Sequence, residues 1–317
     1  MEVPAPIIDM HAHAVAADHH GPPPQGFRLR ELTHLVHDPA APWSDAFRSW
    51  FKEDAPHQVL SPGTDDELRD ETIAVLHRRN IFAVTSGYLR YVDDWRQKAP
   101  DRIIPGAVLD VADPDFTPEE LRALHAEGRV EVLGEVFSQY SGIEPDDPRF
   151  EPYLAVAEEL DLPVHVHVGP GPPGAPYLGF PEYRARLHSP LLLEEPLMRH
   201  PRLRLYVGHA GWPMLDDTLA LLWTHPRVYL DVGIISYGIP TAEFHRYLRA
   251  LVEAGFGNRV MFGSDQMVWP DAIEAAIESI VTAEFLNPEQ KRAILYENAA
   301  RFLRLDSDMV ARHHSPA

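Results

Sequence analysis

The stretch "IIDMHAHAV", which runs from Ile7 to Val15, decides the fold. Its apolar part, Ile7–Met10, has the length and composition of a buried strand, and two histidines follow directly. Side chains two positions apart on a strand point to the same side of the sheet, so His11 and His13 leave this strand in one direction. Two imidazoles that face one space suit a cation such as Zn²⁺. The alternative is a pair of solvated loop histidines, since the chain has 18 histidines.

Short apolar runs of this kind recur along the chain and alternate with amphipathic stretches. The predicted strands are Ile7–Met10, Ile81–Ser86, Ile103–Leu109, Val130–Val136, Val164–Val168, Leu203–Val207, Val228–Val232 and Arg259–Phe262. Between them lie helical patterns such as "TPEELRALHAEG", where Thr117 is the expected N-cap and Gly128 the expected end. This alternation predicts an α/β protein, a parallel (β/α)8 TIM barrel. A doubly wound open sheet is the competing architecture, but the sequence lacks its glycine-rich phosphate turn.

The connection after the first strand is abnormally long. It runs from Val15 to Pro62 and carries four large aromatic residues, Trp43, Phe47, Trp50 and Phe51. Loops of this length are usually functional, so we interpret it as a lid insertion over the barrel mouth. The alternative is a brace that packs on the outer helices.

The boundaries of the domain follow from the point where the alternation of strands and helices ends. The sequence predicts one barrel domain over residues 1–305, with the insertion at 15–62 and a final helix that starts at Asn287. We expect the tail at 306–317 to be disordered and its histidines, His313 and His314, to be solvated.

Composition restricts the classes of partner. The 317-residue chain has a formal net charge of −20, which disfavours nucleic acid and anionic membrane surfaces as partners. It has no cysteine, so any metal must be held by His, Asp or Glu. No apolar stretch has the length of a membrane span, and the N-terminus does not resemble a signal peptide. We therefore expect a cytoplasmic protein with a small-molecule substrate. The oligomeric state is open, with a homodimer as one expectation.

Polar residues gather where the predicted strands end. They are His11 and His13 after the first strand, Glu135 at the fourth, His165 and His167 at the fifth, His209 after the sixth and Asp265 after the eighth. In such barrels the active site lies at the C-terminal ends of the strands. All of these side chains are common metal ligands, so the sequence predicts a metal centre at the barrel mouth. For Glu135 the alternative is an ordinary loop or helix carboxylate.

The motifs "DMHAH", "LPVHVHVG", "VGHAG" and "FGSD" together resemble the amidohydrolase superfamily. The most similar family within it, amidohydrolase-2, includes aminocarboxymuconate-semialdehyde decarboxylase and related metal-dependent hydrolases. The resemblance covers nearly the whole chain and implies a distorted barrel with a divalent metal at its mouth. It also implies that His11, His13, His167 and Asp265 are metal ligands, and that His209 is a catalytic imidazole or the ligand of a second metal.

The segment "GEVF" around Glu135 departs from the decarboxylases of that family. It resembles instead the "GE" turn of TatD-type hydrolases, in which a glutamate bridges two metals. With Glu135 as the bridge, one ion would take His11, His13 and Asp265, and the other would take His167 and His209. Two ions favour hydrolysis by a bridging hydroxide.

His165 and His167 face the same side of the fifth predicted strand, so either of them could be the metal ligand. We expect His167 to be the ligand, because it lies nearer to the loop. His165 would then sit one layer deeper, where a hydrogen bond from it could fix the tautomer of a ligand.

These observations predict a metal-dependent hydrolase that acts on a small apolar or aromatic amide, lactone or ester through a metal-activated water. Asp265 would hold an ion and accept the proton of the water, and His209 would orient the substrate. The alternative is a mononuclear decarboxylase or carbon–carbon hydrolase, in which Glu135 is no ligand and His209 handles protons. The net charge of −20 disfavours a nuclease. The full set of metal ligands disfavours a barrel that binds a ligand without catalysis. One or two Zn²⁺ ions are expected, although Mn²⁺ or Fe²⁺ would also fit.

Overall fold

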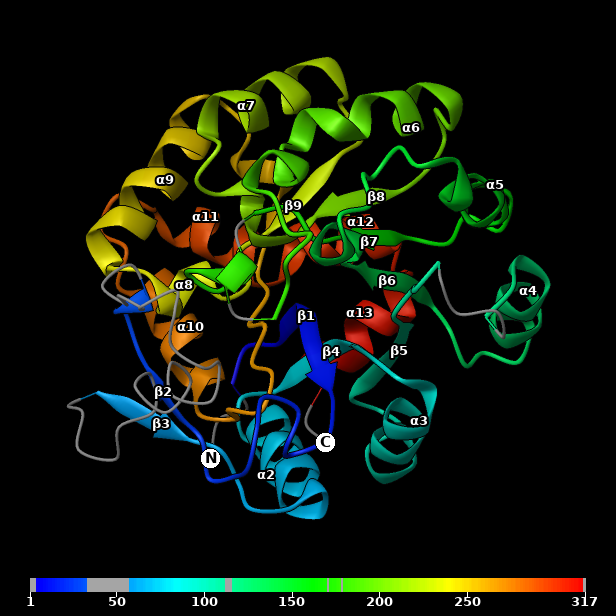
Figure 1. The fold of residues 1–317 in the computed structure, drawn as a ribbon. Coiled ribbons are helices and arrows are strands. Elements are labelled where there is room, and N and C mark those ends of the chain that lie inside the picture. Colours follow the sequence, from blue (N-terminus) through cyan, green and yellow to red (C-terminus); the bar gives the residue numbers. More distant parts are fainter. Residues whose placement is uncertain (1–3, 33–56, 112–115, 170, 178, 316–317) are drawn as a thin grey trace.

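The computed structural model describes residues 4–32, 57–111, 116–169, 171–177 and 179–315 (Figure 1). Eight parallel strands form one sheet, in which sequential strands are neighbours. They are β1 (Ile7–Ala14), β4 (Ile81–Gly87), β5 (Ile103–Ala107), β6 (Val132–Val136), β7 (Val164–Val166), β8 (Leu205–Val207), β9 (Tyr229–Asp231) and β10 (Val260–Met261). Each of the eight predicted strands is present, and the predicted TIM barrel is confirmed.

The sheet curls until its first and last strands meet. Met10 N donates to Phe262 O (2.9 Å), and Asp265 N donates to His11 O (2.5 Å). These bonds nearly close the barrel. They bring His11 from the first strand and Asp265, which follows the last strand, together at the mouth.

Helices between the strands cover the outside of the barrel (Figure 1). The helices of the described residues are α2 (Asp65–Arg78), α3 (Leu89–Lys98), α4 (Pro118–Ala126), α5 (Glu151–Glu159), α6 (Glu194–Arg199), α7 (Leu215–Thr224), α8 (Ile235–Gly238), α9 (Thr241–Glu253), α10 (Ala272–Val281), α11 (Pro288–Arg292), α12 (Asn298–Leu303) and α13 (Ser307–His314). Of the helices after β10, α12 and α13 pack against the apolar side chains in the barrel lumen. The expected cap of α4 is present, since the Thr117 side chain accepts from Glu120 N. Asn287 and Gln290 form a reciprocal capping box at the start of α11.

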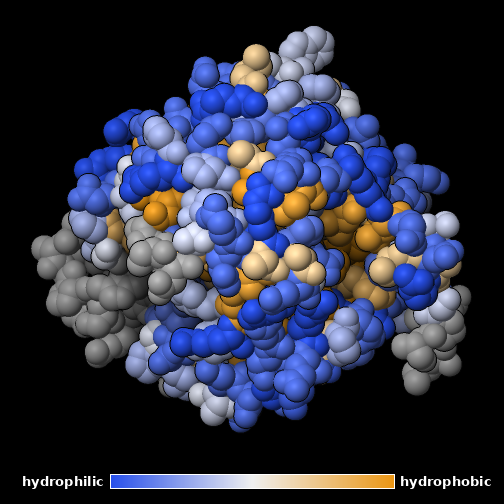
Figure 2. Space-filling model, turned by 90° about the vertical axis from the view of Figure 1, so that its right-hand side faces the viewer, coloured by the Kyte–Doolittle hydropathy of each residue, from blue (hydrophilic) through white to orange (hydrophobic). Residues whose placement is uncertain are grey.

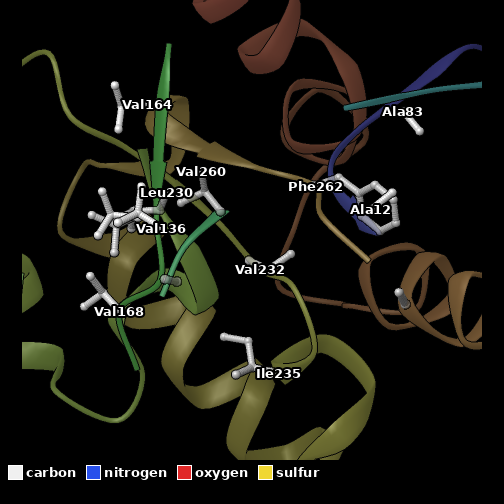
Figure 3. Packing of buried hydrophobic residues seen from close by; sticks show 14 of the residues in the cluster. Ala12, Ala83, Val136, Val164, Val168, Leu230, Val232, Ile235, Val260 and Phe262 are labelled. Carbon is white, nitrogen blue, oxygen red and sulfur yellow. The ribbon is translucent and has the colours of Figure 1, made fainter. Parts of the chain in front are cut away.

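Two clusters of buried apolar side chains make the core. Figure 3 shows part of the larger one, where Val136, Val164, Leu230 and Val260 from four strands come together. The smaller cluster contains Ile8, Met10, Phe82, Val84, Val132, Tyr206, Met261, Tyr296 and Phe302. Its strand residues come from β1, β4, β6, β8 and β10, which lie around the whole sheet, so they meet in the barrel lumen, where Tyr296 and Phe302 from the C-terminal helices join them. The barrel is therefore a packed core, and its chemistry is confined to the mouth.

The expectation that residues 306–317 are disordered is wrong for the described part of this tail, because α13 forms there. Asp306 caps this helix by accepting from Met309 N (2.7 Å). The ring of His313 is buried and stacks on Phe82, with 3.5 Å between the ring centroids. Burial of His313 and contact of Val310 with the lumen cluster offset the cost of ordering the chain end.

Residues 33–56 of the long insertion, with its four aromatic residues, lie outside the described residues, so the lid stays a prediction. The described flanks pair as a short antiparallel ribbon of β2 (Gly26–Arg28) and β3 (Gln58–Leu60). Phe27 packs against Trp269 (4.8 Å between ring centroids), and Trp269 Nε1 donates to Gln25 O (3.0 Å). The insertion is thus attached to the loop after β10, beside the mouth.

The face shown in Figure 2 is mainly hydrophilic, with interrupted apolar patches between the polar groups. Within the described ranges, none of the helices combines the length and the apolar character that a membrane span requires.

Candidate metal centre

His11 and His13 converge at the end of β1, where their Nε2 atoms lie 3.1 Å apart. Gln266 holds the backbone of His13 from both sides, since its Oε1 accepts from His13 N (3.0 Å) and its Nε2 donates to His13 O (2.7 Å). The pairing of β1 with β4 shifts register between Asp9 and Ala12. This irregularity lies at the point where the strand changes from lumen-filling residues to the histidines.

Asp265 and Glu135 complete a first group of donor atoms around these imidazoles. Asp265 Oδ1 lies 3.0 Å from His13 Nε2 and 3.6 Å from His11 Nε2. Glu135 Oε2 lies 3.6 Å from each of the two Nε2 atoms. Ligand atoms about 2.1 Å from a tetrahedral cation would be roughly 3.4 Å apart, so these distances fit one divalent ion. Within the described part of the chain Asp265 Oδ1 has no hydrogen-bond partner, as expected of a free ligand atom.

A second group of donor atoms uses the other oxygen of Glu135. Oε1 lies 2.7 Å from His167 Nδ1 and 3.5 Å from His209 Nε2, and these two nitrogens are 2.9 Å apart. Glu135 therefore stands between the two groups with one oxygen toward each, as a bridging carboxylate would. The ligand roles themselves stay predictions.

Gly134 explains how Glu135 reaches this position. Its φ is +137°, and a Cβ built there would lie 2.5 Å from His165 O, so only glycine lets β6 approach β7 this closely. The pairing of β6 with β7 is irregular between Leu133 and Val136, which turns Glu135 into the mouth.

His165 and His167 have different surroundings, and the choice of His167 as the ligand stays a prediction. His167 faces Glu135 and His209, whereas His165 is fully buried and stacks on Tyr206 at 4.3 Å between ring centroids. His165 has a ligand atom within 4.8 Å of ligand atoms of His11 and Glu135, but its Nε2 lies 2.9 Å from Asp231 Oδ2.

His209 is fixed in the tautomer that a ligand or an acid–base residue needs. Its Nδ1 donates to Gly233 O (3.0 Å), so Nε2 faces His167 and Glu135. The backbone at His209 is left-handed, with φ of 55°, as the chain turns sharply out of β8.

Asp231, the last residue of β9, belongs to the site although its sequence pattern did not predict it. Its fully buried carboxylate accepts from Gly233 N (2.7 Å), and Oδ1 lies 3.1 Å from His11 Nδ1. Placing the strand end at Val232 hid the signal, because Asp231 then seemed to lie within the strand. Asp9 was missed as well, and its Oδ1 accepts from His11 N (3.0 Å) and Ser264 N (2.9 Å).

The electrostatics of the site follow from these contacts. Burial alone would lower the pKa of His11, but the carboxylates of Asp265, Asp231 and Glu135 outweigh it and raise the pKa well above its usual value. Burial would raise the pKa of Glu135, but the neighbouring His11 and His167 hold it well below its usual range. The carboxylates are thus ionised and buried, an environment that favours a divalent cation.

A TIM barrel whose mouth gathers four histidines and two carboxylates has the architecture of a metal-dependent enzyme. The family model described as Amidohydrolase matches residues 8–305, and the chain belongs to this family. The expected amidohydrolase relationship is therefore confirmed, and with it the general class of enzyme.

Named relatives give a finer comparison. A gamma-resorcylate decarboxylase from Rhodococcus jostii is 30% identical over 250 residues, which are 66% of this chain and 73% of that protein. A 5-carboxyvanillate decarboxylase from Novosphingobium aromaticivorans, complexed with manganese and 4-hydroxy-3-methoxy-5-nitrobenzoic acid, has a TM-score of 0.62 at 14% identity over 96% of this chain and 99% of its own. A probable 2-pyrone-4,6-dicarboxylic acid hydrolase from Acinetobacter baumannii has a TM-score of 0.61 at 17% identity over 94% and 99%. The named curated relative agrees better with the decarboxylase alternative than with the hydrolase.

Proposed function

We propose that this protein is a metal-dependent decarboxylase that removes CO2 from a hydroxylated aromatic carboxylic acid. The observation that carries the proposal is the 30% identity to gamma-resorcylate decarboxylase over 73% of that protein. The cluster of donor atoms at the mouth supports it, because a carboxylate and an adjacent phenolic oxygen are ligands that a divalent ion binds.

His11, His13 and Asp265 would hold the ion. Glu135 would be the fourth protein ligand, unlike in the mononuclear alternative expected from the sequence, because its Oε2 lies 3.6 Å from both Nε2 atoms. When bound, the ion supplies positive charge that fixes the acidic end of the substrate. Zn²⁺ is the ion we expect, and the manganese in the Novosphingobium structure makes Mn²⁺ the first alternative.

His209 is the proposed proton donor. In the reaction the bond between the ring and the carboxylate breaks, its electron pair stays on the ring carbon, and that carbon takes a proton. Burial opposes protonation of His209, but its contacts with Glu135 and Asp265 raise its pKa above the usual value. A proton on Nε2 would therefore be available beside the ion, and Asp265 would compensate its charge.

The experiment is to load the purified protein with Zn²⁺ or Mn²⁺ and to measure CO2 release from gamma-resorcylate (2,6-dihydroxybenzoate). We expect turnover that is lost in His209→Asn, while the variant keeps its metal. Amide, lactone and ester panels run on the same preparations serve as the control. Hydrolysis of one of these panels without CO2 release from any hydroxybenzoate would contradict the proposal.

A dinuclear hydrolase is the second candidate, favoured by the position of Glu135 between two groups of donor atoms. It predicts two ions per chain in the wild type and about one in Glu135→Gln, since the amide cannot bridge as a carboxylate does. The decarboxylase predicts one ion in the wild type. Metal content measured by mass spectrometry after gel filtration separates the two candidates.

A further inference from the structure

His188 lies in the loop between β7 and α6, at the end of the short 3-10 turn Ala185–His188. Its side chain is fully buried. Within the described residues, neither Nδ1 nor Nε2 has a hydrogen-bond partner. Two unsatisfied ring nitrogens without access to water destabilise a fold, so a role in packing alone does not explain a histidine here.

The ring of His188 belongs to a group that we call the aromatic wall, formed by Tyr140, Phe180, Tyr183 and His188. The ring centroid of His188 lies 4.5 Å from that of Tyr183 and 5.3 Å from that of His167. Tyr140 lies 5.2 Å from His167 and 5.0 Å from Phe180. The wall therefore borders the metal centre on the His167 side, and its partly exposed members, Tyr140 and Phe180, make it accessible.

The wall is held in place by contacts that do not involve the nitrogens of His188. Tyr183 Oη accepts from Gly171 N (2.7 Å), which ties the ring to the loop after β7. A Cβ at Gly171 would lie 2.6 Å from Tyr140 Oη, so the absence of a side chain there makes room for the Tyr140 ring. The hydrogen-bonding groups of His188 are left for another partner.

Two other buried histidines of this chain behave differently. His200 has Nε2 at 2.9 Å from Glu151 and Nδ1 at 3.5 Å from Glu158, and His313 Nδ1 lies 3.1 Å from Tyr296 Oη. Both lie away from the mouth and are paired with side chains of the fold. His188 is unpaired at the border of the metal centre.

We propose that His188 is a substrate-contacting residue that hydrogen-bonds a phenolic hydroxyl of an aromatic acid whose ring packs against the aromatic wall. The inference rests on the proposed function for the class of substrate. A neutral imidazole offers one donor and one acceptor, and a phenolic hydroxyl also donates and accepts, so the two match in either orientation. The aromatic wall favours an aromatic ring over an aliphatic chain. Enclosure by the wall removes water that would compete for the hydrogen bond.

The test uses the metal-loaded full chain and two probes, 2,6-dihydroxybenzoate and benzoate, which differ only in the hydroxyls. Kd is measured by calorimetry for the wild type, His188→Leu, His188→Asn and His188→Gln. In His188→Leu we expect Kd to rise about 10- to 100-fold for 2,6-dihydroxybenzoate and to change little for benzoate. Either His188→Asn or His188→Gln, whose amide nitrogens stand near the Nδ1 and Nε2 positions, should recover part of the loss.

The matched control is His200→Leu, which removes a buried but paired histidine. We expect it to lower Tm and to leave both Kd values unchanged, whereas His188→Leu should keep or raise Tm because it removes unsatisfied groups. A lower Tm together with an unchanged ratio of the two Kd values in His188→Leu would overturn the proposal. It would also be overturned if the wild type bound 2,6-dihydroxybenzoate no more tightly than benzoate.

The proposed function and this inference can fail separately. CO2 release by the wild type together with an unchanged Kd ratio in His188→Leu would leave the decarboxylase standing and remove the role of His188. A hydroxyl-dependent Kd that is lost in His188→Leu, without CO2 release, would leave the binding role and remove the decarboxylase.

Discussion

The contact with the Asp231 carboxylate determines which ring nitrogen of His11 is free to bind a metal. Oδ1 lies 3.1 Å from His11 Nδ1 and Oδ2 lies 2.9 Å from His165 Nε2, so one buried anion serves two imidazoles. An N–H on His11 Nδ1 leaves the lone pair on Nε2, the atom that faces His13 and Asp265. Asp231 is therefore a positioning residue for the centre.

Asp231→Asn should weaken metal binding about 10- to 100-fold, because the amide lacks the charge that Asp231 places beside His11 Nδ1 and His165 Nε2. Competition with a chelator of known affinity measures this. Asp93→Asn, which removes a surface partner of Arg129, is the control and should bind metal as the wild type does. An unchanged affinity in Asp231→Asn would show that the His11 tautomer does not depend on this contact.

Strands and helices are the level at which the sequence was most informative. Runs such as Ile81–Ser86 and Val164–Val168 predicted strands because parallel strands buried on both faces must be almost continuously apolar. Thr117 predicted the start of α4 because the N-cap contact depends only on nearby residues.

Contacts between distant elements were harder to predict, and the site depends on them. The positions of His11, His13 and Asp265 at the ends of predicted strands indicated one metal centre, but nothing local indicates that Asp231 reaches His11 across 220 positions. Nothing in the local sequence indicates the surroundings of His188, since the rings of Tyr140 and His167 beside it come from other parts of the chain. The tail was misjudged for the same reason, because α13 is ordered by contacts with Phe82 on β4.

The attachment of α13 should depend on pH through His313. Burial, followed by the charge of Arg102, lowers the pKa of His313 to about 4. Well above pH 6.5 the histidine is neutral whether the helix is attached or not, so attachment does not vary with pH there. Between pH 6.5 and about 4 the detached helix takes up a proton and the attached one does not, so attachment weakens as the pH falls.

Hydrogen exchange of a peptide that spans α13, corrected for intrinsic rates, should therefore show less protection at pH 5 than at pH 7.5. His313→Gln has no titrating ring and should show nearly equal protection at both values. Equal protection of α13 in the wild type at both values would contradict the role of His313.

At the scale of the molecule, the centre joins strands from both ends of the sheet. His11 and His13 lie in the C-terminal half of β1, Asp265 follows β10, and Glu135 on β6 comes from the opposite side of the barrel. An ion held by these residues ties the closure of the barrel, where Asp265 N bonds His11 O, to the far wall. We therefore expect only the complete folded barrel to bind the metal, and no fragment of it.

Because the unfolded chain cannot assemble these ligands, metal should stabilise the fold by linkage. Free Zn²⁺ or Mn²⁺ at about 100 times its Kd adds about 2.7 kcal/mol, which in a chain of this size should raise Tm by roughly 3–8 °C. Differential scanning calorimetry of protein stripped with a chelator and then reloaded measures the shift. Asp265→Ala removes a central ligand and should lose most of the shift, while Asp93→Asn should keep it. A stripped wild type with the Tm of the loaded protein would contradict a metal centre built across the barrel mouth.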